Sequence, residues 1–391
     1  MTEALVRGTG PGDILDYVRR LGPTTRRDIQ LATGLSRVTV GQRVESLLAS
    51  GFLRERGRAD STGGRRPLQL EFDPEAGVVL TAALNTERAW VGVVDLGLAV
   101  LVTREISVEI SPDPAHTLDV LLTSMRSVLA ETGRDASSAI GIGLSVPGPV
   151  DPASGRLNEP PIMSGWHDFD IAGHFQRSLD LPVLVENDAN AMALGEYVAE
   201  YPDEDALVFL KVSTGIGAGI VLDGRVWAGH DGGAGDIGHM RVSADPGGRV
   251  CRCGSVGCLA ADASGGSLAT QLRQGGFADV ATARDVADLV RTGTPEAIAL
   301  VRHAGAQIGE VMASLVSVVN PEVVIVGGDL AGPELLSAMV SSMLPRCMPR
   351  ATRHLQVRLS TLGETATLIG VAHQVISHVY APERVNRRLS R

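Results

Sequence analysis

Three of the chain's four cysteines lie within eight residues, and this cluster constrains the fold more narrowly than any other feature. Cys251, Cys253 and Cys258 form the cluster, and His239 lies twelve residues before the first of them. Three thiolates and one imidazole are a complete tetrahedral ligand set for zinc, which leaves no position for water or substrate. The spacing therefore predicts a structural Zn2+ site. Free cysteines in a Gly-rich loop, or a disulfide in an oxidising compartment, are the alternatives.

The composition argues against a membrane protein and favours a cytoplasmic one. The chain has 391 residues, of which 44% are hydrophobic, enough for two or three domains with their own cores. No run approaches the ~18 consecutive apolar residues of a membrane-spanning helix. No basic segment followed by an apolar one, as in a signal peptide, is found at the N-terminus. Lys211 is the only lysine among 35 basic residues, which is typical of a GC-rich genome and says little about mechanism.

Charge is distributed unevenly along the chain. Residues 1–70 contain 12 arginines and 7 acidic residues, a net charge of +5, whereas the whole chain carries −10. A basic N-terminal segment on an acidic body is typical of a nucleic-acid-binding module joined to another domain. An arginine-rich solvated face explains the charge equally well, so the residue pattern has to decide between the two.

The N-terminal pattern predicts three short helices. Residues 12–21 place apolar side chains at helical spacing, and a proline ends that run. Thr25 followed by Asp28 indicates the capped start of a second helix, and Gly34 supplies the turn after it. Ser36 caps a third helix, whose buried face is formed by Val40, Val44, Leu47 and Leu48. Two helices joined by a glycine turn are the helix-turn-helix arrangement.

The third helix of such a unit enters the DNA major groove by its N-terminal end. Arginine and glutamine can read guanine and adenine edges there, and hydroxyl groups suit phosphates. Residues 52–56 and 68–70 are expected to form the two strands of a wing with a basic tip. The candidate DNA-contacting residues are Thr25, Ser36, Arg37, Thr39, Gln42, Arg43, Arg65 and Arg66. A small helical dimerisation domain is the alternative, but caps, turn, polar face and wing all agree with DNA binding.

From about residue 74 onward, β-rich segments alternate with helices. Three consecutive short strands, an amphipathic helix and a buried strand lie between residues 77 and 144. A second set of strands and helices follows from residue 183, with long helices near 295–318 and 364–379. Two similar α/β units predict a duplicated, two-lobed fold with a cleft between the lobes. We expect the linker to the N-terminal domain at residues 71–76.

Two glycine-rich turns and one polar segment are candidates for ligand binding in that cleft. The loop Ser213–Gly219 lies between two strands, where its N–H groups could cradle phosphate, and Gly327-Gly328 follows a third strand. Such turns occur in many α/β proteins, so neither is specific. Asn187 and Asp188 come directly after a buried strand, at the start of a helix. They are candidates for a general base or for hydroxyl-binding groups, and helix capping is the alternative explanation.

Together these segments resemble the ROK family of sugar kinases and sugar-responsive repressors. The resemblance extends over the whole chain, through Gly63–Pro67, Val146–Pro149, Asn187–Ala191, Gly215–Gly219, Ala234–His239, the cysteine cluster and Asn320–Gly328. It implies an α/β protein in which a winged helix-turn-helix (1–72) precedes a two-lobed actin/hexokinase-like body of duplicated ribonuclease H-like units. Lobe 1 would span 73–200, completed by a C-terminal helix at about 364–380, and lobe 2 would span 201–363 with the zinc site and an oligomerisation surface. Family members with the N-terminal winged helix are typically transcription factors.

The chain departs from the kinases of the family at the phosphate loop. Those kinases hold ATP and magnesium with an Asp-x-Gly-Gly-Thr type loop, and the matching residues here are Ala83-Leu84-Asn85-Thr86-Glu87. Both glycines are missing, and Glu87 places negative charge where phosphate would approach. Asp188, which matches the catalytic base, remains as a vestige. We therefore expect no enzyme activity.

The sugar contacts that the resemblance implies are altered as well. The segment Pro161–Trp166, where an Asn is expected before the Gly-Trp pair, contains none, Asp236 stands where Glu is usual, and Ala260 replaces an expected Glu. The candidate ligand-binding residues that remain are Asn187, Asp188, Asp236 and His239. Because sugar hydroxyls need hydrogen-bond partners to offset their lost water, an ordinary hexose should bind weakly. Either the ligand is a modified or less polar sugar, or the cleft has lost effector control.

The sequence thus predicts a homodimeric or homotetrameric transcriptional repressor of carbohydrate-related genes, which binds operator DNA and senses a sugar-derived effector. A ligand that changes lobe closure would change the spacing of two DNA-binding domains on a palindromic operator. A ROK-type sugar kinase and an effector-independent DNA-binding protein are the alternatives.

Overall fold

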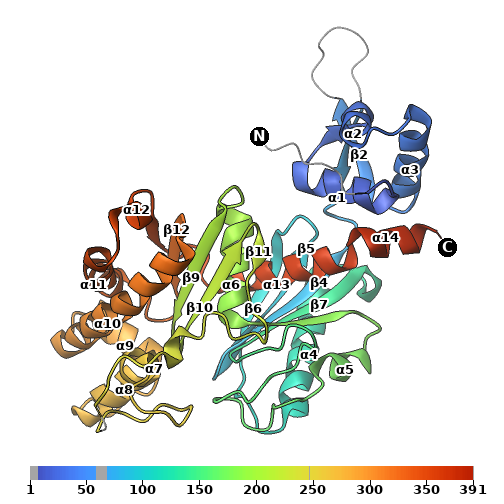
Figure 1. Ribbon diagram of the computed structural model, residues 1–391. Coiled ribbons are helices and arrows are strands. Elements are labelled where there is room, and N and C mark those ends of the chain that lie inside the picture. Colours follow the sequence, from blue (N-terminus) through green and yellow to red (C-terminus); the bar gives the residue numbers. More distant parts are fainter. Residues whose placement is uncertain (1–7, 59–67, 246, 391) are drawn as a thin grey trace.

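The computed structural model describes residues 8–58, 68–245 and 247–390, and it shows a small N-terminal domain beside two α/β lobes (Figure 1). The N-terminal domain, called the head below, contains helices α1 (Pro11–Leu21), α2 (Arg26–Thr33) and α3 (Arg37–Ala49). Its strands are β1 (Thr24–Thr25), β2 (Leu53–Arg58) and β3 (Leu68–Phe72), which form an antiparallel sheet in the order β1-β3-β2. This is the winged helix-turn-helix that the sequence predicts.

Local capping explains where the helices of the head begin. The Thr25 hydroxyl accepts a hydrogen bond from the Asp28 N–H, and the Asp28 carboxylate accepts one from the Thr25 N–H. The Ser36 hydroxyl in the same way accepts from the Thr39 N–H at the start of α3. Between the helices, Gly34 has a φ of +67°, the left-handed conformation that ends α2. Strand β1 was not predicted, because two residues leave no alternating pattern.

The two lobes repeat one sheet topology, as predicted for a duplicated body. The sheet of lobe 1 has the order β6-β5-β4-β7-β8, and that of lobe 2 has the order β11-β10-β9-β12-β13. In each lobe the first three strands pair antiparallel, the fourth strand pairs in parallel with the first, and the fifth pairs in parallel with the fourth. No helix within the described ranges is long and apolar enough to cross a membrane.

The elements of lobe 1 are β4 (Val78–Leu84), β5 (Arg88–Asp95), β6 (Val100–Ser107), α4 (Pro114–Glu131), β7 (Ala139–Val146), α5 (Ile171–Gln176), β8 (Val183–Asn187) and α6 (Asp188–Glu200). Those of lobe 2 are β9 (Ala206–Val212), β10 (Ile216–Leu222), β11 (Arg225–Val226), α7 (Leu259–Ala263), α8 (Gly265–Gln274), α9 (Ala283–Arg291), α10 (Pro295–Val319), β12 (Val323–Gly327), α11 (Pro333–Met343), α12 (Pro349–Thr352) and β13 (Gln356–Leu359). The chain ends with α13 (Glu364–Val379) and α14 (Pro382–Leu389).

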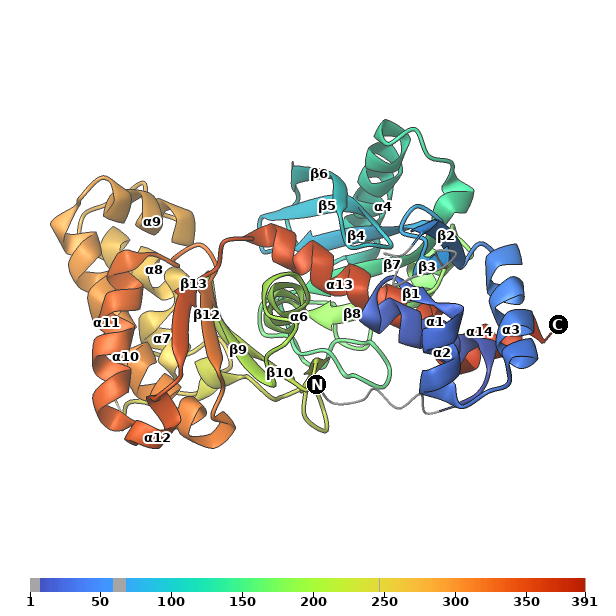
Figure 2. The same ribbon diagram turned by 90° about the horizontal axis from the view of Figure 1, so that it is seen from above.

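Two helices packed against each other join the lobes. Helix α6 packs on β9 and β10 of lobe 2, whereas α13 packs on β4 and β7 of lobe 1 (Figure 2). Glycines allow the close approach: a Cβ on Gly195 would lie 1.8 Å from the Ala366 carbonyl oxygen, and one on Gly370 would lie 1.9 Å from that of Ala191. Movement of one lobe against the other therefore has to move α13 relative to α6.

The connection between the head and lobe 1 is shorter than predicted. We expected a linker at 71–76, but β3 continues to Phe72 and only residues 73–77 connect it to β4. Glu71 is the reason, because its buried carboxylate accepts hydrogen bonds from Arg54 and Arg56 of β2 at 2.7 and 2.9 Å. The charged residue thus belongs to the sheet and not to a solvated linker.

Candidate functional site

The outward face of α3 changes character along the helix. Its buried side is formed by Val40, Val44 and Leu47. The exposed residues of its N-terminal half are Arg37, Val38 and Gln42. The C-terminal half presents Glu45, which pairs with Arg26 at 2.7 Å, and Arg26 also reaches Glu55 of β2 at 3.4 Å. Because a carboxylate repels phosphate, the N-terminal half of α3 is the part suited to approach DNA.

The other predicted DNA-contacting residues lie around this face. The hydroxyl groups of Ser36 and Thr39 are 2.9 Å apart at the tip of α3, and Thr25 caps α2. Arg43 is half-buried, and its Nη1 is buried without a hydrogen-bond partner among the described atoms. Arg43 is therefore less available to a base than Arg37. The predicted wing-tip residues Arg65 and Arg66 lie outside the described residues.

The C-terminal helix α14 fastens the head to the body and lies directly beneath it in Figure 1. The Asn386 side-chain oxygen accepts a hydrogen bond of 2.7 Å from the Gly12 N–H of α1. Between α13 and α14, the Tyr380 ring contacts Phe52 and Phe72 of the head edge-on, with centroid distances of 5.5 and 5.0 Å. Helix α13 begins at the cleft and leads into this junction, so it connects the cleft with the head.

The predicted zinc ligands come together in lobe 2. One donor atom from each of His239, Cys251, Cys253 and Cys258 lies within 4.8 Å of all the others. His239 Nδ1 lies 3.6 Å from Cys251 Sγ, and Cys253 Sγ lies 3.8 Å from Cys258 Sγ. A hydrogen bond from the Ser255 backbone lowers the pKa of the Cys253 thiol to about 6, whereas burial raises the pKa of the Cys258 thiol to about 12. Three sulfurs and one nitrogen around one point fit a tetrahedral Zn2+ ion.

A cleft of about 480 Å³ opens beside this cluster, between the two lobes. It is lined by Pro147, Gly148, Pro149 and Ile162 from lobe 1, and by residues 213–217, 249–252, Asp236, His239 and Ala260 from lobe 2. Trp166 is buried outside it, and its Nε1 donates to the Ser111 carbonyl at 2.8 Å. The segment before Trp166 therefore gives the cleft an apolar edge.

The only lysine of the chain lies on the floor of the cleft. Lys211 Nζ is 2.5 Å from Asp188 Oδ2 and 3.2 Å from Asn85 Oδ1. Its side chain is 8% exposed and that of Asp188 is 16% exposed. Burial opposes the charge of Lys211, but the carboxylates of Asp188 and Glu364 outweigh that effect and raise its pKa. Asp188 thus already has a cationic partner. The sequence contained this signal, but we interpreted the single lysine as a matter of genome composition.

The remaining predicted ligand-binding residues differ in their availability. The Asn187 side-chain oxygen accepts from the N–H groups of Ala189 and Asn190, and its Nδ2 donates to the Gly148 carbonyl. Asn187 therefore acts as the N-cap of α6, the alternative that we considered from sequence. Asp236 has no such contact within the described residues, and burial raises the pKa of its carboxyl group.

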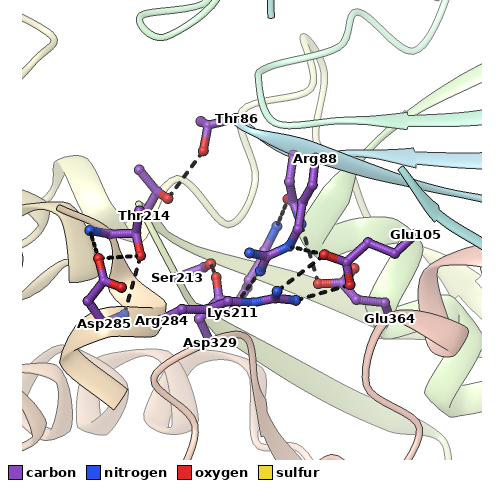
Figure 3. Close-up of polar contacts among 12 residues, drawn as sticks. Thr86, Arg88, Glu105, Lys211, Ser213, Thr214, Arg284, Asp285, Asp329 and Glu364 are labelled. Carbon is purple, nitrogen blue, oxygen red and sulfur yellow. Dashed lines mark hydrogen bonds and ion pairs between the residues drawn. The ribbon is translucent and has the colours of Figure 1, made fainter. Parts of the chain in front are cut away.

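A second polar cluster, the interlobe latch, connects the two lobes and includes Ser213, which also lines the cleft (Figure 3). Asp329, which follows Gly327-Gly328, accepts a hydrogen bond from the Ser213 hydroxyl and pairs with Arg88 of lobe 1. Arg284 of α9 lies 3.5 Å from Asp329 and 3.2 Å from Glu105 of lobe 1. We define the latch as Arg88, Glu105, Ser213, Arg284 and Asp329.

The latch occupies the place where the sequence suggested a phosphate cradle. The Ser213 hydroxyl donates a hydrogen bond to Asp329, which directly follows the Gly327-Gly328 turn, and the Thr86 and Thr214 hydroxyls lie 3.4 Å apart across the lobes. The carbonyls of Ser213 and Thr214 accept hydrogen bonds from the Gly265 and Gly266 N–H groups. The Asp329 carboxylate thus lies beside the loop that the sequence suggested as a phosphate cradle. The sequence reasoning missed Arg88, Arg284 and Asp329, because nothing local marks them as partners.

Comparison with known proteins gives one family match. The family model described as "ROK family" matches residues 87–377. A xylose repressor from Bacillus spizizenii is 28% identical over 372 residues, which cover 93% of this chain and 94% of the repressor. A glucokinase from Thermotoga maritima is 30% identical over 287 residues, covering 69% of this chain and 88% of the kinase.

One similar solved structure is that of a ROK family transcriptional regulator, described as a homologue of the Escherichia coli MLC protein. The similarity covers 97% of this chain and 98% of the regulator, with a TM-score of 0.79 and 24% sequence identity. That likeness shows the fold. The repressor matches extend over nearly the full chain, whereas the kinase match covers about two thirds of it.

Proposed function

This chain belongs to the ROK family, and on that premise we propose that it is a sugar-responsive transcriptional repressor of carbohydrate-related genes. The observation that carries the proposal is the 93% coverage by the xylose repressor, which leaves almost no part of this chain unmatched. The head supports it independently, since α3 is capped, packs on α1 and α2, and leaves Arg37, Val38 and Gln42 exposed on its N-terminal half. Operator DNA and a sugar-derived effector are the partners that follow.

We propose further that the protein does not phosphorylate its ligand. A general base must be free to accept the proton of the attacking hydroxyl, and Asp188 is paired with Lys211 at 2.5 Å. Phosphoryl transfer also needs a positively charged cradle for phosphates. In the latch the charges of Arg88 and Arg284 already have Asp329 and Glu105 as partners. These contacts of Asp188, Arg88 and Arg284 support the proposal that the protein is not a kinase.

Signal transfer would run along α13. Its first residue, Glu364, accepts a hydrogen bond from Asn85 at 3.3 Å beside the Lys211–Asp188 pair. Its last turn leads through Tyr380 to the contacts with Phe52 and Phe72 of the head. A ligand that changes lobe closure would shift α13 and with it the orientation of the head. In a homodimer or homotetramer, such a shift changes the distance between two recognition helices on a palindromic operator.

Zinc would have a structural role in this scheme. His239, Cys251, Cys253 and Cys258 would hold the ion, and four protein ligands leave no position for catalysis. His239 also lines the cleft, so the ion would fix this part of the wall. When bound, zinc supplies cross-linking of the loop 239–258 and no chemistry on the ligand.

DNA binding is tested with duplexes that the purified protein selects from a random pool. We expect affinity to fall steeply with salt, because arginines that contact phosphate displace counterions. The double variant Arg37→Ala/Arg43→Ala should lose most of its preference for the selected duplex over random DNA. The matched control is Arg291→Ala, an exposed arginine of α9 in lobe 2, which should bind like wild type. An unchanged preference in the double variant would show that α3 is not the recognition helix.

The kinase alternative has support of its own, since a glucokinase is 30% identical to this chain and Asp188 is retained. It is tested by coupled assay with Mg-ATP and a panel of hexoses. Turnover that disappears in Asp188→Asn would establish the kinase and contradict our proposal. Absence of turnover, together with sugar-dependent release of DNA, would support the proposal of a repressor without kinase activity.

A further inference from the structure

Two residues on the exposed face of α3 do not favour the stability of the head by itself. Val38 is a large apolar side chain, yet it is 70% exposed. Gly41 lies in the interior of the helix, where glycine destabilises relative to alanine because it has more backbone freedom to lose. A Cβ on Gly41 would meet no heavy atom within 4 Å, so no neighbour in the described chain requires a glycine there. Internal packing therefore explains neither residue.

Both residues face the same way. On a helix, positions three and four apart lie on one face, so Val38, Gly41 and Gln42 form one continuous surface, with Arg37 at its edge. The next position along this face is Glu45, whose carboxylate is already paired with Arg26. The surface is thus apolar and nearly flat in its centre, with donor groups at one side and a neutralised charge at its far end.

We propose that Val38 and Gly41 form a base-reading patch that recognises thymine methyl groups in the major groove. The inference rests on the proposed function, in which α3 is the recognition helix. The thymine C5-methyl is the apolar group that the major groove presents, and valine is a complementary surface for it. Gly41 allows the backbone of α3 to come close to the base edges, because no side chain projects between them. Arg37 and Gln42 then read the neighbouring bases by hydrogen bonds.

Sequences that break local rules tend to do so at functional positions, and DNA is the partner whose charge fits the surroundings. Residues 1–70 carry a net charge of +5, and Arg37 flanks the patch. An apolar protein partner would instead need a larger apolar area than one valine beside a glycine. The occupant to which we commit is a duplex with thymine opposite Val38.

The first experiment removes the methyl group from the DNA alone. In the duplex selected by the wild-type protein, each thymine of a half-site is replaced in turn by deoxyuridine, which lacks only the C5-methyl. At one or two positions affinity should fall about fourfold for each lost methyl contact. In Val38→Ala the same replacement should have almost no further effect, because the contact is already absent. This double-mutant cycle separates the contact from any general effect of either change.

The second experiment uses Gly41→Ala, for which stability and binding should move in opposite directions. The melting temperature should rise, since alanine is the better helix former. Affinity for the selected duplex should fall roughly tenfold or more, since the methyl separates α3 from the bases. Binding to random DNA, which depends on phosphate contacts, should change little. A higher melting temperature also shows that the variant is folded.

The proposal is overturned if wild type selects a duplex but tolerates deoxyuridine at every thymine, or if Gly41→Ala binds that duplex as well as wild type. Failure of the underlying function has another signature, namely that the wild-type protein selects no duplex at any salt concentration. If Val38→Ala keeps its DNA affinity but loses a protein–protein contact, the patch binds a protein partner and the proposal is rejected.

Discussion

Removal of the Asp329 carboxylate should destabilise the protein by opening the interlobe latch. Asp329 and Arg88 are each only 14% exposed, so water replaces little of the lost interaction. Breaking a fully buried ion pair costs about 3–5 kcal/mol, because the remaining charge stays buried without a partner. Partial exposure and the second partner of Arg88, Glu105 at 4.0 Å, reduce that figure. We therefore expect Asp329→Ala to lower the free energy of unfolding by about 2 kcal/mol.

The expected shift is measurable. For domains of this size about 2 kcal/mol corresponds to a fall in melting temperature of roughly 4–8 °C. Asp329→Asn should be milder, because its amide oxygen still accepts the hydrogen bond from Ser213. Scanning calorimetry gives the stability, and small-angle scattering should show a larger radius of gyration, since Arg88 and Asp329 belong to different lobes.

A double-mutant cycle isolates the pair. Arg88→Ala should cost much less in the Asp329→Ala background than in wild type, with a coupling energy of about 1–2 kcal/mol. The control cycle is Arg302 with Glu334, an ion pair of 2.6 Å within lobe 2 whose side chains are 61% and 32% exposed. Surface pairs of this kind contribute about 0–1 kcal/mol. If the Arg88 and Asp329 effects add without coupling, the latch does not hold the lobes together and our reasoning is refuted.

Three further predictions concern the metal, pH and the cleft. Elemental analysis should find about one zinc per chain. The zinc should be lost in Cys258→Ser but kept in Cys347→Ser, the matched control outside the cluster. Folded wild-type protein without zinc would contradict the proposed site. Burial, and then the charge of Arg19 in the head, lowers the pKa of His373 to about 4, whereas an unfolded histidine titrates near 6.5. As pH falls from about 6.5 to 4, the unfolded state binds the proton first, so the free energy of unfolding should decline in this range. The decline should be smaller in His373→Gln, and equal pH profiles for the two proteins would refute the role of His373. Lys211 is the only lysine and is buried against Asp188. An amine-acetylating reagent should therefore modify it slowly in folded wild-type protein and faster in Asp329→Ala, as followed by mass spectrometry. Rapid labelling of wild type would show that the cleft is open.

The head was predictable because its signals are local. Thr25, Gly34 and Ser36 each determine a cap or a turn within four residues of themselves, and in the structure α2 runs from Thr25 to Gly34 and α3 begins after Ser36. The cluster of His239 with three cysteines was predictable for a related reason, since the three cysteines lie within one loop. The two lobes could be predicted because strands such as β4 and β12 consist almost entirely of apolar residues, which the structure buries.

What the sequence did not reveal depends on contacts between distant residues. Arg88 and Asp329 are 241 positions apart and meet only when the lobes close. Helix α14 has a single buried residue, Val385, and its docking depends on Asn386 reaching Gly12 at the other end of the chain. The role of Lys211 likewise needs the fold, because β9 alone does not show that its side chain faces Asp188. Pairings of this kind leave no periodic pattern for a sequence interpretation to use.

We propose that one chain binds specific DNA and releases it in response to a sugar without chemistry on that sugar. Fluorescence anisotropy of the selected duplex, with sugars added in the absence and presence of Mg-ATP, tests this most directly. Xylose enters the panel first, because a protein named a xylose repressor matches 93% of this chain. We predict release by at least one sugar or sugar derivative, with the same midpoint with and without ATP and with the sugar recovered unchanged. Binding that no sugar affects, or release that requires ATP and yields a phosphorylated sugar, would contradict the account.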